Sequence, residues 1–182
     1  MKRRHLLLSL IGSVGLAGRW RTLHAAADPI DIDAIRKDWR ALLDPAAEID
    51  LSLEPVDKPK AEWRKVLPQE SYDVLFEEDT EPPFSNALNG EKRAGVYICR
   101  ACGLPLFTSA MKYDSGTGWP SFFASIPGHL ATKVDNLLWI ERTEYHCVRC
   151  GGHQGHVFDD GPPPTRERWC NNGLALRFIP HV

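Results

Sequence analysis

The five cysteines of this 182-residue chain form two matched pairs and leave one residue over. Cys99 with Cys102, and Cys147 with Cys150, each follow the pattern Cys-x-x-Cys-Gly, and 44 residues separate the two pairs. A gap of two residues brings both sulfurs of one turn to the same ion, and two such pairs complete the tetrahedron that Zn²⁺ prefers. Glycine after the second cysteine permits the backbone bend that aims amides at the sulfurs. The spacing predicts one closed, structural Zn²⁺ site on these four residues.

Other chemistry is compatible with paired cysteines. Iron competes with zinc for the same four-thiolate geometry. Two local disulfides or two redox dithiols would use the same residues, but each pair would then need its own environment. Four thiolates on Zn²⁺ carry a formal charge of −2, which Arg100 and Arg149, one inside each pair, would partly offset.

The remaining cysteine, Cys170, follows Arg168-Trp169 and precedes two asparagines. A free cysteine is more often a buried, inert residue than a reactive one. Upstream, His153 and His156 place two imidazoles three residues apart, and an imidazole beside a thiol can stabilise the thiolate and deliver a proton near neutral pH. Either histidine could instead lie on the surface or support the metal turn. The residues alone leave both interpretations open.

A glycine-containing turn, residues 116–118, presents Trp119. The face of this indole could receive a small apolar group or a cation. It could equally be a core aromatic at the corner of a sheet.

The segment that carries these residues, 80–180, has the character of antiparallel sheet, with proline or glycine every few residues. Short aromatic or β-branched runs predict strands at residues 96–98, 137–140, 144–148 and 174–179. Before it, residues 58–67 and 69–76 predict two short helices broken by Pro68. A further amphipathic helix, preceded by the capping-type residues Asp31 and Asp33, is predicted from Ile32, Ile35, Trp39, Leu42 and Leu43.

The composition is that of one globular domain. The chain is 43% hydrophobic and 25% charged, with 14 glycines and 14 prolines, which excludes disordered, collagen-like and coiled-coil proteins. The net charge of −2 lacks the basic footprint of a protein that binds nucleic acid or an anionic membrane.

Residues 1–27 have the layout of an export signal: a basic start, an apolar run at 6–17 and a small-residue stretch at 25–27. The run is shorter than the roughly 20 residues needed to span a bilayer. Arg3-Arg4 indicates the twin-arginine route, and we expect a periplasmic protein. Removal of this segment would leave 17 basic against 24 acidic residues, a charge of −7.

In combination, the motifs resemble those of the B-type methionine sulfoxide reductases, over residues 63–180. The resemblance is carried by Thr80-Glu81-Pro82-Pro83-Phe84, the two Cys-x-x-Cys-Gly turns, Gly118-Trp119-Pro120-Ser121-Phe122, Arg142-Thr143-Glu144, His153-x-Gly155-His156-Val157-Phe158-x-Asp160-Gly161-Pro162 and Arg168-Trp169-Cys170-x-Asn172.

The resemblance implies a mainly β fold of two antiparallel sheets, with short N-terminal helices and a zinc-binding end. It implies one structural Zn²⁺ on the four paired cysteines and Cys170 as the nucleophile that reduces the R epimer of methionine sulfoxide in proteins or peptides. Trp119 would hold the substrate S-methyl group, and His153, His156 and Asn172 would line the site of the sulfoxide oxygen. On this basis we expect an export signal at 1–27, an acidic, partly helical extension at 28–57 and a reductase domain at 58–182.

The chain departs from many relatives in its recycling chemistry. Where they carry a resolving cysteine, just before the glycine and tryptophan of the turn, this sequence has Thr117. With four cysteines on metal, the sulfenic acid left on Cys170 would need an external thiol, from a thioredoxin-like or glutaredoxin-like protein or a small molecule. We expect a monomer that repairs oxidised proteins and does not bind nucleic acid.

Two other functions fit parts of the sequence. A zinc-stabilised binding module without catalysis would keep the paired cysteines but would not need Cys170, the histidines and Trp119 together. A thiol reductase of the same fold could act on another sulfoxide or on a peroxide.

Overall fold

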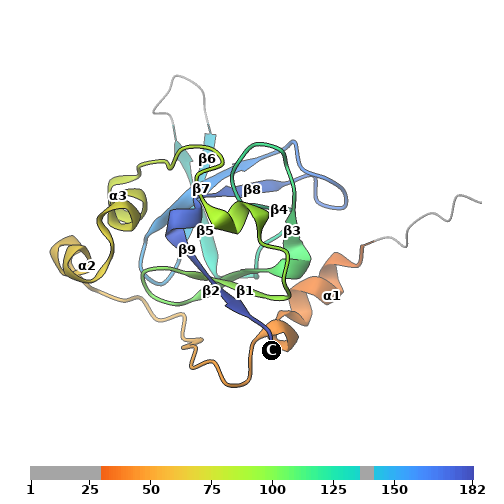
Figure 1. The fold of residues 1–182 in the computed structure, drawn as a ribbon, viewed down its shortest axis with the longest axis horizontal. Coiled ribbons are helices and arrows are strands. Elements are labelled where there is room, and N and C mark those ends of the chain that lie inside the picture. The colour runs from red at the N-terminus through yellow and green to blue at the C-terminus, as the bar shows by residue number, and fades with distance from the viewer. Residues whose placement is uncertain (1–29, 136–141) are drawn as a thin grey trace, which may run out of the picture.

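The computed structural model describes residues 30–135 and 142–182 (Figure 1). The predicted signal at 1–27 and the predicted strand at 137–140 lie outside these residues. In the described part, short helices precede a series of antiparallel strands. These elements are α1 (Ile32–Lys37), α2 (Lys60–Val66), α3 (Gln69–Glu77), β1 (Gly95–Cys99), β2 (Pro105–Thr108), β3 (Lys112–Tyr113), β4 (Ser121–Phe122), β5 (Leu130–Asp135), β6 (Arg142–Cys147), β7 (His153–Phe158), β8 (Arg168–Asn171) and β9 (Leu176–Pro180).

The strands form two antiparallel sheets. The larger has the order β3-β4-β8-β7-β6-β5 and the smaller the order β2-β1-β9. The aromatic side chains of both sheets meet in the core, where Phe107 of β2 stacks on Phe122 of β4 with ring centroids 4.1 Å apart. The predicted fold class, mainly β with two antiparallel sheets and short N-terminal helices, is confirmed. Among the described residues, none of the helices has the length and apolar character to cross a membrane.

The register of the larger sheet aligns a row of polar and nucleophilic side chains on one of its faces. Across the sheet from β5 to β3, directly opposed residues are Lys133, Glu144, His156, Cys170, Ser121 and Tyr113. Opposed residues direct their side chains to the same face, and the next position along each strand faces the other way. Phe122 and Trp169, one position away, contact the core aromatics. The pleat therefore separates the polar and nucleophilic groups from the apolar core.

Both helices predicted on either side of Pro68 are present, the first over Lys60–Val66 instead of 58–67 and the second over Gln69–Glu77 instead of 69–76. α2 and α3 follow Pro59 and Pro68, since proline lacks an N–H that the first helical turn would leave without a partner. The side chain of Asp31 caps α1 by accepting from the N–H of Ala34 at 3.0 Å. The predicted helix of the N-terminal extension is shorter than its apolar pattern. It ends at Lys37, and a 3₁₀ turn carries Trp39 into a buried position.

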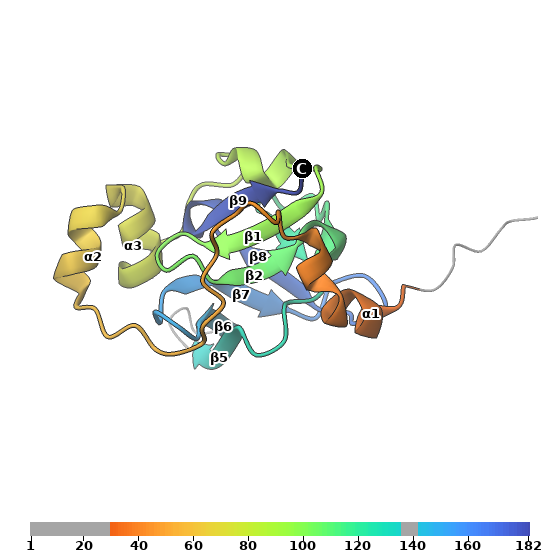
Figure 2. The same cartoon turned by 90° about the horizontal axis from the view of Figure 1, so that it is seen from below.

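The segment between α1 and α2 ties the extension to the rest of the fold, and Figure 2 shows its path from one helix to the other. The rings of Trp39 and His129 pack edge to face, with their centroids 5.4 Å apart. The N–H of Val56 donates to the carbonyl of Arg149 at 2.7 Å, and the Arg149 guanidinium pairs with Asp50. The extension thus contacts the second cysteine turn directly.

Candidate active site and metal centre

The four paired cysteines converge. Their sulfur atoms all lie within 4.8 Å of one another, with Cys99 and Cys150 at 3.6 Å and Cys102 and Cys147 at 3.5 Å. A tetrahedron with metal–sulfur bonds of about 2.3 Å has edges of about 3.8 Å. A disulfide needs sulfurs about 2.05 Å apart. The arrangement therefore fits one metal ion held by four thiolates.

The two cysteine turns have the same backbone geometry. The N–H of Gly103 donates to the carbonyl of Cys99, and the N–H of Gly151 donates to that of Cys147, both at 2.9 Å. The glycines have φ values of 78° and 69°, a left-handed conformation that residues with a side chain rarely adopt. The predicted backbone bend is confirmed. The amide of Gln154, which is buried, lies 3.6 Å from the Cys99 sulfur.

A separate cavity of about 160 Å³ brings together four of the predicted active-site residues, namely Trp119, His156, Cys170 and Asn172. Its other lining residues are Thr80, Arg142, Gly155, Phe158 and Asn171. His153 lies behind this lining, 3% exposed, with its ring 5.5 Å from that of His156. The structure thus joins segments that are more than 50 residues apart around one thiol.

Close strand packing fixes the position of Cys170. A Cβ atom at Gly155, on the neighbouring strand β7, would lie 1.9 Å from the Cys170 carbonyl oxygen, so only glycine fits there. Burial raises the pKa of the Cys170 thiol, while the charge of Arg168 and hydrogen bonds from Thr117 and Arg168 act to lower that pKa. Two bonds to Asp160, at 2.7 and 2.9 Å, hold the Arg168 guanidinium.

Glu81 connects the two walls of the cavity, a role that its sequence motif did not reveal. Its carbonyl accepts from the indole N–H of Trp119 at 3.0 Å, and its N–H donates to the side-chain oxygen of Asn172 at 3.2 Å. Its buried carboxylate accepts from the N–H groups of Gly173 and Leu174, at 2.6 and 2.8 Å. One residue therefore sets the relative positions of the indole and the amide.

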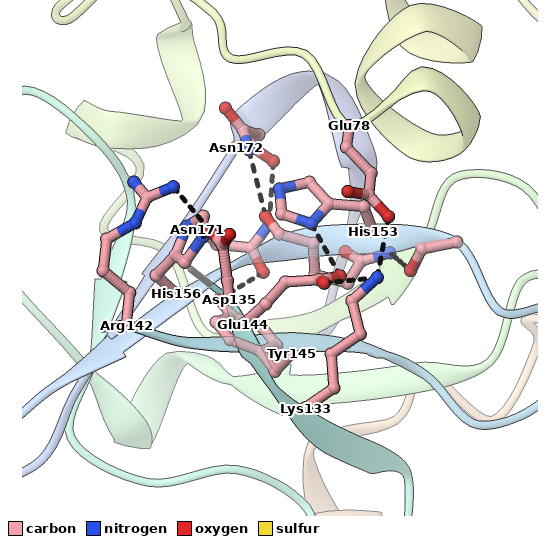
Figure 3. Close-up of polar contacts among 12 residues, drawn as sticks. Glu78, Lys133, Asp135, Arg142, Glu144, Tyr145, His153, His156, Asn171 and Asn172 are labelled. Atoms are coloured by element: carbon pink, nitrogen blue, oxygen red, sulfur yellow. Dashed lines mark hydrogen bonds and ion pairs between the residues drawn. The ribbon is translucent and has the colours of Figure 1, made fainter. Parts of the chain in front are cut away.

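Each of the two histidines is hydrogen-bonded to a carboxylate (Figure 3). His153 Nδ1 lies 2.9 Å from Glu144 Oε1, and His156 Nε2 lies 2.9 Å from Asp135 Oδ2. Burial lowers the pKa of His153 to about 4 and also lowers that of His156. Both rings are therefore mainly neutral at pH 7. The ring nitrogens left without a carboxylate partner are His156 Nδ1, on a ring that lines the cavity, and His153 Nε2, which is buried and without a hydrogen-bond partner among the described residues.

Additional charged groups surround these pairs, and the sequence motifs assign them no role. Lys133 Nζ lies 2.7 Å from both Glu144 Oε2 and Glu78 Oε1, and Arg142, which lines the cavity, donates to Asp135 at 2.5 Å. The available signal was the Arg142-Thr143-Glu144 motif, but the sequence does not show which histidine each acidic group contacts.

Comparisons with known proteins agree with this geometry. The SelR domain matches residues 67–180. The peptide methionine sulfoxide reductase MsrB of Methanosarcina barkeri is 49% identical over 124 residues, which cover 68% of this chain and 87% of that protein. Proteins of the same name from Agrobacterium fabrum and Hahella chejuensis are 46% and 48% identical, over 72% and 69% of this chain and 98% and 91% of their own lengths. The chain therefore belongs to the SelR domain family, as the resemblance of its motifs to the B-type methionine sulfoxide reductases predicts.

Proposed function

We propose that this protein reduces the R epimer of methionine sulfoxide, in proteins or peptides, with Cys170 as the nucleophile. The observation that carries the proposal is the cavity in which Cys170, Trp119, His156 and Asn172 meet. The indole N–H of Trp119 is bonded to the Glu81 carbonyl, so its apolar face is available for an S-methyl group. The names of the MsrB relatives support the reaction class.

The chemistry requires a thiolate and a proton donor at one sulfoxide. Attack by the Cys170 thiolate transfers the oxygen to Cys170 as a sulfenic acid, with uptake of one proton. The methionine sulfur gains two electrons and the cysteine sulfur loses two. A hydrogen bond or proton on the oxygen makes the substrate sulfur electrophilic. Asn172 and Arg142 supply N–H donors in the cavity, and His156 Nδ1 is the atom that can take up a proton and pass it on.

Recycling is proposed to use an external thiol. The chain has five cysteines, and four of them form the cluster proposed to hold the metal ion, so no second cysteine remains for Cys170. A thiol attacks the Cys170 sulfenic acid, forming a mixed disulfide and releasing water, and a second thiol then frees Cys170. Thioredoxin-like or glutaredoxin-like proteins and small thiols supply this chemistry. The four clustered cysteines are proposed to hold one structural Zn²⁺, which would contribute to folding.

Export is proposed from the composition of residues 1–27, with the periplasm as destination and the twin-arginine route as the path. The proposed clients are then oxidised envelope proteins. We further propose that the enzyme acts as a monomer.

One assay tests the function. The zinc-loaded protein and its Cys170→Ser variant are given R and S methionine sulfoxide, free and within a peptide, with dithiothreitol as reductant. We expect turnover of the R epimer alone, and none with the variant. Activity retained by Cys170→Ser would refute the nucleophile assignment. Loss of zinc from that variant would show that the metal ligands are misassigned, and absence of turnover of either epimer by the wild type would favour a binding module.

A further inference from the structure

Three hydroxyl groups form a continuous path beside the thiol of Cys170. The Thr117 hydroxyl lies beside the Cys170 sulfur and acts to lower the pKa of that thiol, and its Oγ1 lies 2.8 Å from Ser115 Oγ. Ser115 Oγ lies 2.8 Å from Ser121 Oγ, and Ser121 Oγ donates to the carbonyl of Trp119 at 3.1 Å. Ser121 is fully buried and directly opposes Cys170 across strands β4 and β8.

The protonation state of Cys170 decides in which direction the hydrogen bonds along this path are donated. Each hydroxyl has one proton to donate. When Cys170 is a thiol, its proton points to Thr117, Thr117 donates to Ser115, Ser115 to Ser121, and Ser121 to the Trp119 carbonyl. When Cys170 is a thiolate, Thr117 has to donate to the sulfur, so Ser115 donates to Thr117 and Ser121 donates to Ser115. Each hydroxyl turns about its own C–O bond, and no proton passes from one residue to another.

We propose that Ser121, Ser115 and Thr117 form a reversible hydrogen-bond chain that donates to the Cys170 sulfur in its thiolate state. Thr117 contacts the reacting atom, and Ser115 and Ser121 are positioning residues that orient its hydroxyl. The inference rests on the proposed role of Cys170 as nucleophile. Hydrogen bonds in such a chain polarise one another, so the sulfur feels the whole chain through Thr117. The residue found in place of a resolving cysteine thereby has a function of its own.

Other charged and titratable groups also face this sulfur, and the test has to leave them in place. They are Arg168 of β8, Asp160 beside it, Tyr113 of β3, Arg142 of β6 and His156 of β7. Tyr145 of β6 packs on the core side of the sheet and interacts with the charge of Cys170. Burial opposes ionisation of Cys170, and Arg168 and Thr117 are the groups that counter it. Arg168 is a fixed cation held by Asp160, whereas the hydroxyl chain can change direction with the state of the sulfur.

The test measures the pH dependence of Cys170 alkylation by iodoacetamide, followed by mass spectrometry of the peptide that contains Cys170, in the zinc-loaded protein. Thr117→Val removes the hydroxyl and keeps the branched shape, and Thr117→Ser keeps the hydroxyl. Because a hydrogen bond to an ionised group is worth about 1.5 kcal/mol or more, we expect alkylation of Thr117→Val to be about tenfold slower below its midpoint pH, with the midpoint moved upward. Ser115→Ala should shift the midpoint in the same direction by a smaller amount, and Thr117→Ser should match the wild type.

Superimposable profiles for Thr117→Val and the wild type would overturn the proposal, as would an equal shift in Thr117→Ser, which would assign the effect to packing. Zinc content and Tm show that each variant is folded. Alkylation requires no sulfoxide, so a failure of the chain and a failure of the proposed reductase activity appear in different measurements.

Discussion

Glu144 and His153 form a buried pair, with Oε1 2.9 Å from Nδ1 and each side chain only 3% exposed. The carboxylate also meets Lys133, whose other partner is the exposed Glu78. A buried carboxylate that orients a neutral imidazole fixes which ring nitrogen carries the proton. Glu144 therefore determines that His153 presents Nε2 as an acceptor, and its removal tests how much of the site depends on this contact.

Lys133 gives a matched comparison of its two carboxylate partners. Its Nζ lies 2.7 Å from both, yet Glu144 is 3% exposed and Glu78 is 56% exposed. We expect Glu144→Gln to lower the free energy of unfolding by about 1–3 kcal/mol, because hydrogen bonds to a buried charged group are lost. Glu78→Gln should cost less than about 1 kcal/mol, because water screens that pair. Urea unfolding of the zinc-loaded variants measures both, and equal losses would contradict the distinction.

Stability should fall as the pH drops below 6.5, in part because of His153. Burial lowers its folded-state pKa to about 4 from the ordinary 6.5, so between these values the unfolded chain binds more protons than the folded one. From pH 7.5 to pH 5 this single group should remove about 2 kcal/mol from the free energy of unfolding. His153→Asn should flatten the curve by about that amount. A curve of unchanged slope in His153→Asn would contradict this assignment.

The cluster of four cysteines that could hold a metal ion was predictable from the sequence because its pattern is local. Each Cys-x-x-Cys-Gly turn brings its own two ligands together and closes with a glycine at positive φ, so two short motifs define the site. The break between α2 and α3 at Pro68 was predictable for the same reason. Local patterns carried less information about the strands. β3 and β4 are two residues long and have no periodicity to detect, and β7 is interrupted by a glycine and two histidines.

The supports of the active site depend on pairings that the sequence does not show. Glu81 bonds Asn172 across 91 positions, and the opposition of Cys170 and Ser121 follows from the register of two strands. A shift of one residue in that register would send Ser121 to the other face. The sequence therefore indicates which residue types can react, while the order of strands decides which neighbours control their protons.

Loss of a metal-binding cysteine should destabilise the fold, whereas loss of Cys170 should not. Cys102→Ser removes one of four sulfurs within 4.8 Å of one another, so we expect the bound metal to fall from one ion per chain to well below one. Tm should drop by at least roughly 10 °C, because the binding energy of a structural metal is folding energy. Cys170→Ser should keep its metal and its Tm. Elemental analysis of the purified proteins measures the metal and separates zinc from iron, and a metal-free, fully stable wild type would contradict this assignment.

The indole of Trp119 makes two contributions that variants can separate: its apolar ring face and the hydrogen bond that holds the ring in place. Its N–H is bonded to the Glu81 carbonyl at 3.0 Å, so the ring is held by its edge while it lines the cavity. Trp119→Ala removes the apolar surface, and the lost burial of one methyl group, about 0.8 kcal/mol, should raise KM for a peptide sulfoxide at least about fourfold. Trp119→Phe keeps an aromatic face and loses only the hydrogen bond to the Glu81 carbonyl, so its KM should rise less than that of Trp119→Ala. Cys170 alkylation should be unchanged in both variants. If both variants lost kcat equally and kept an unchanged KM, the hydrogen bond to Glu81, and not the ring face, would be the contribution of Trp119.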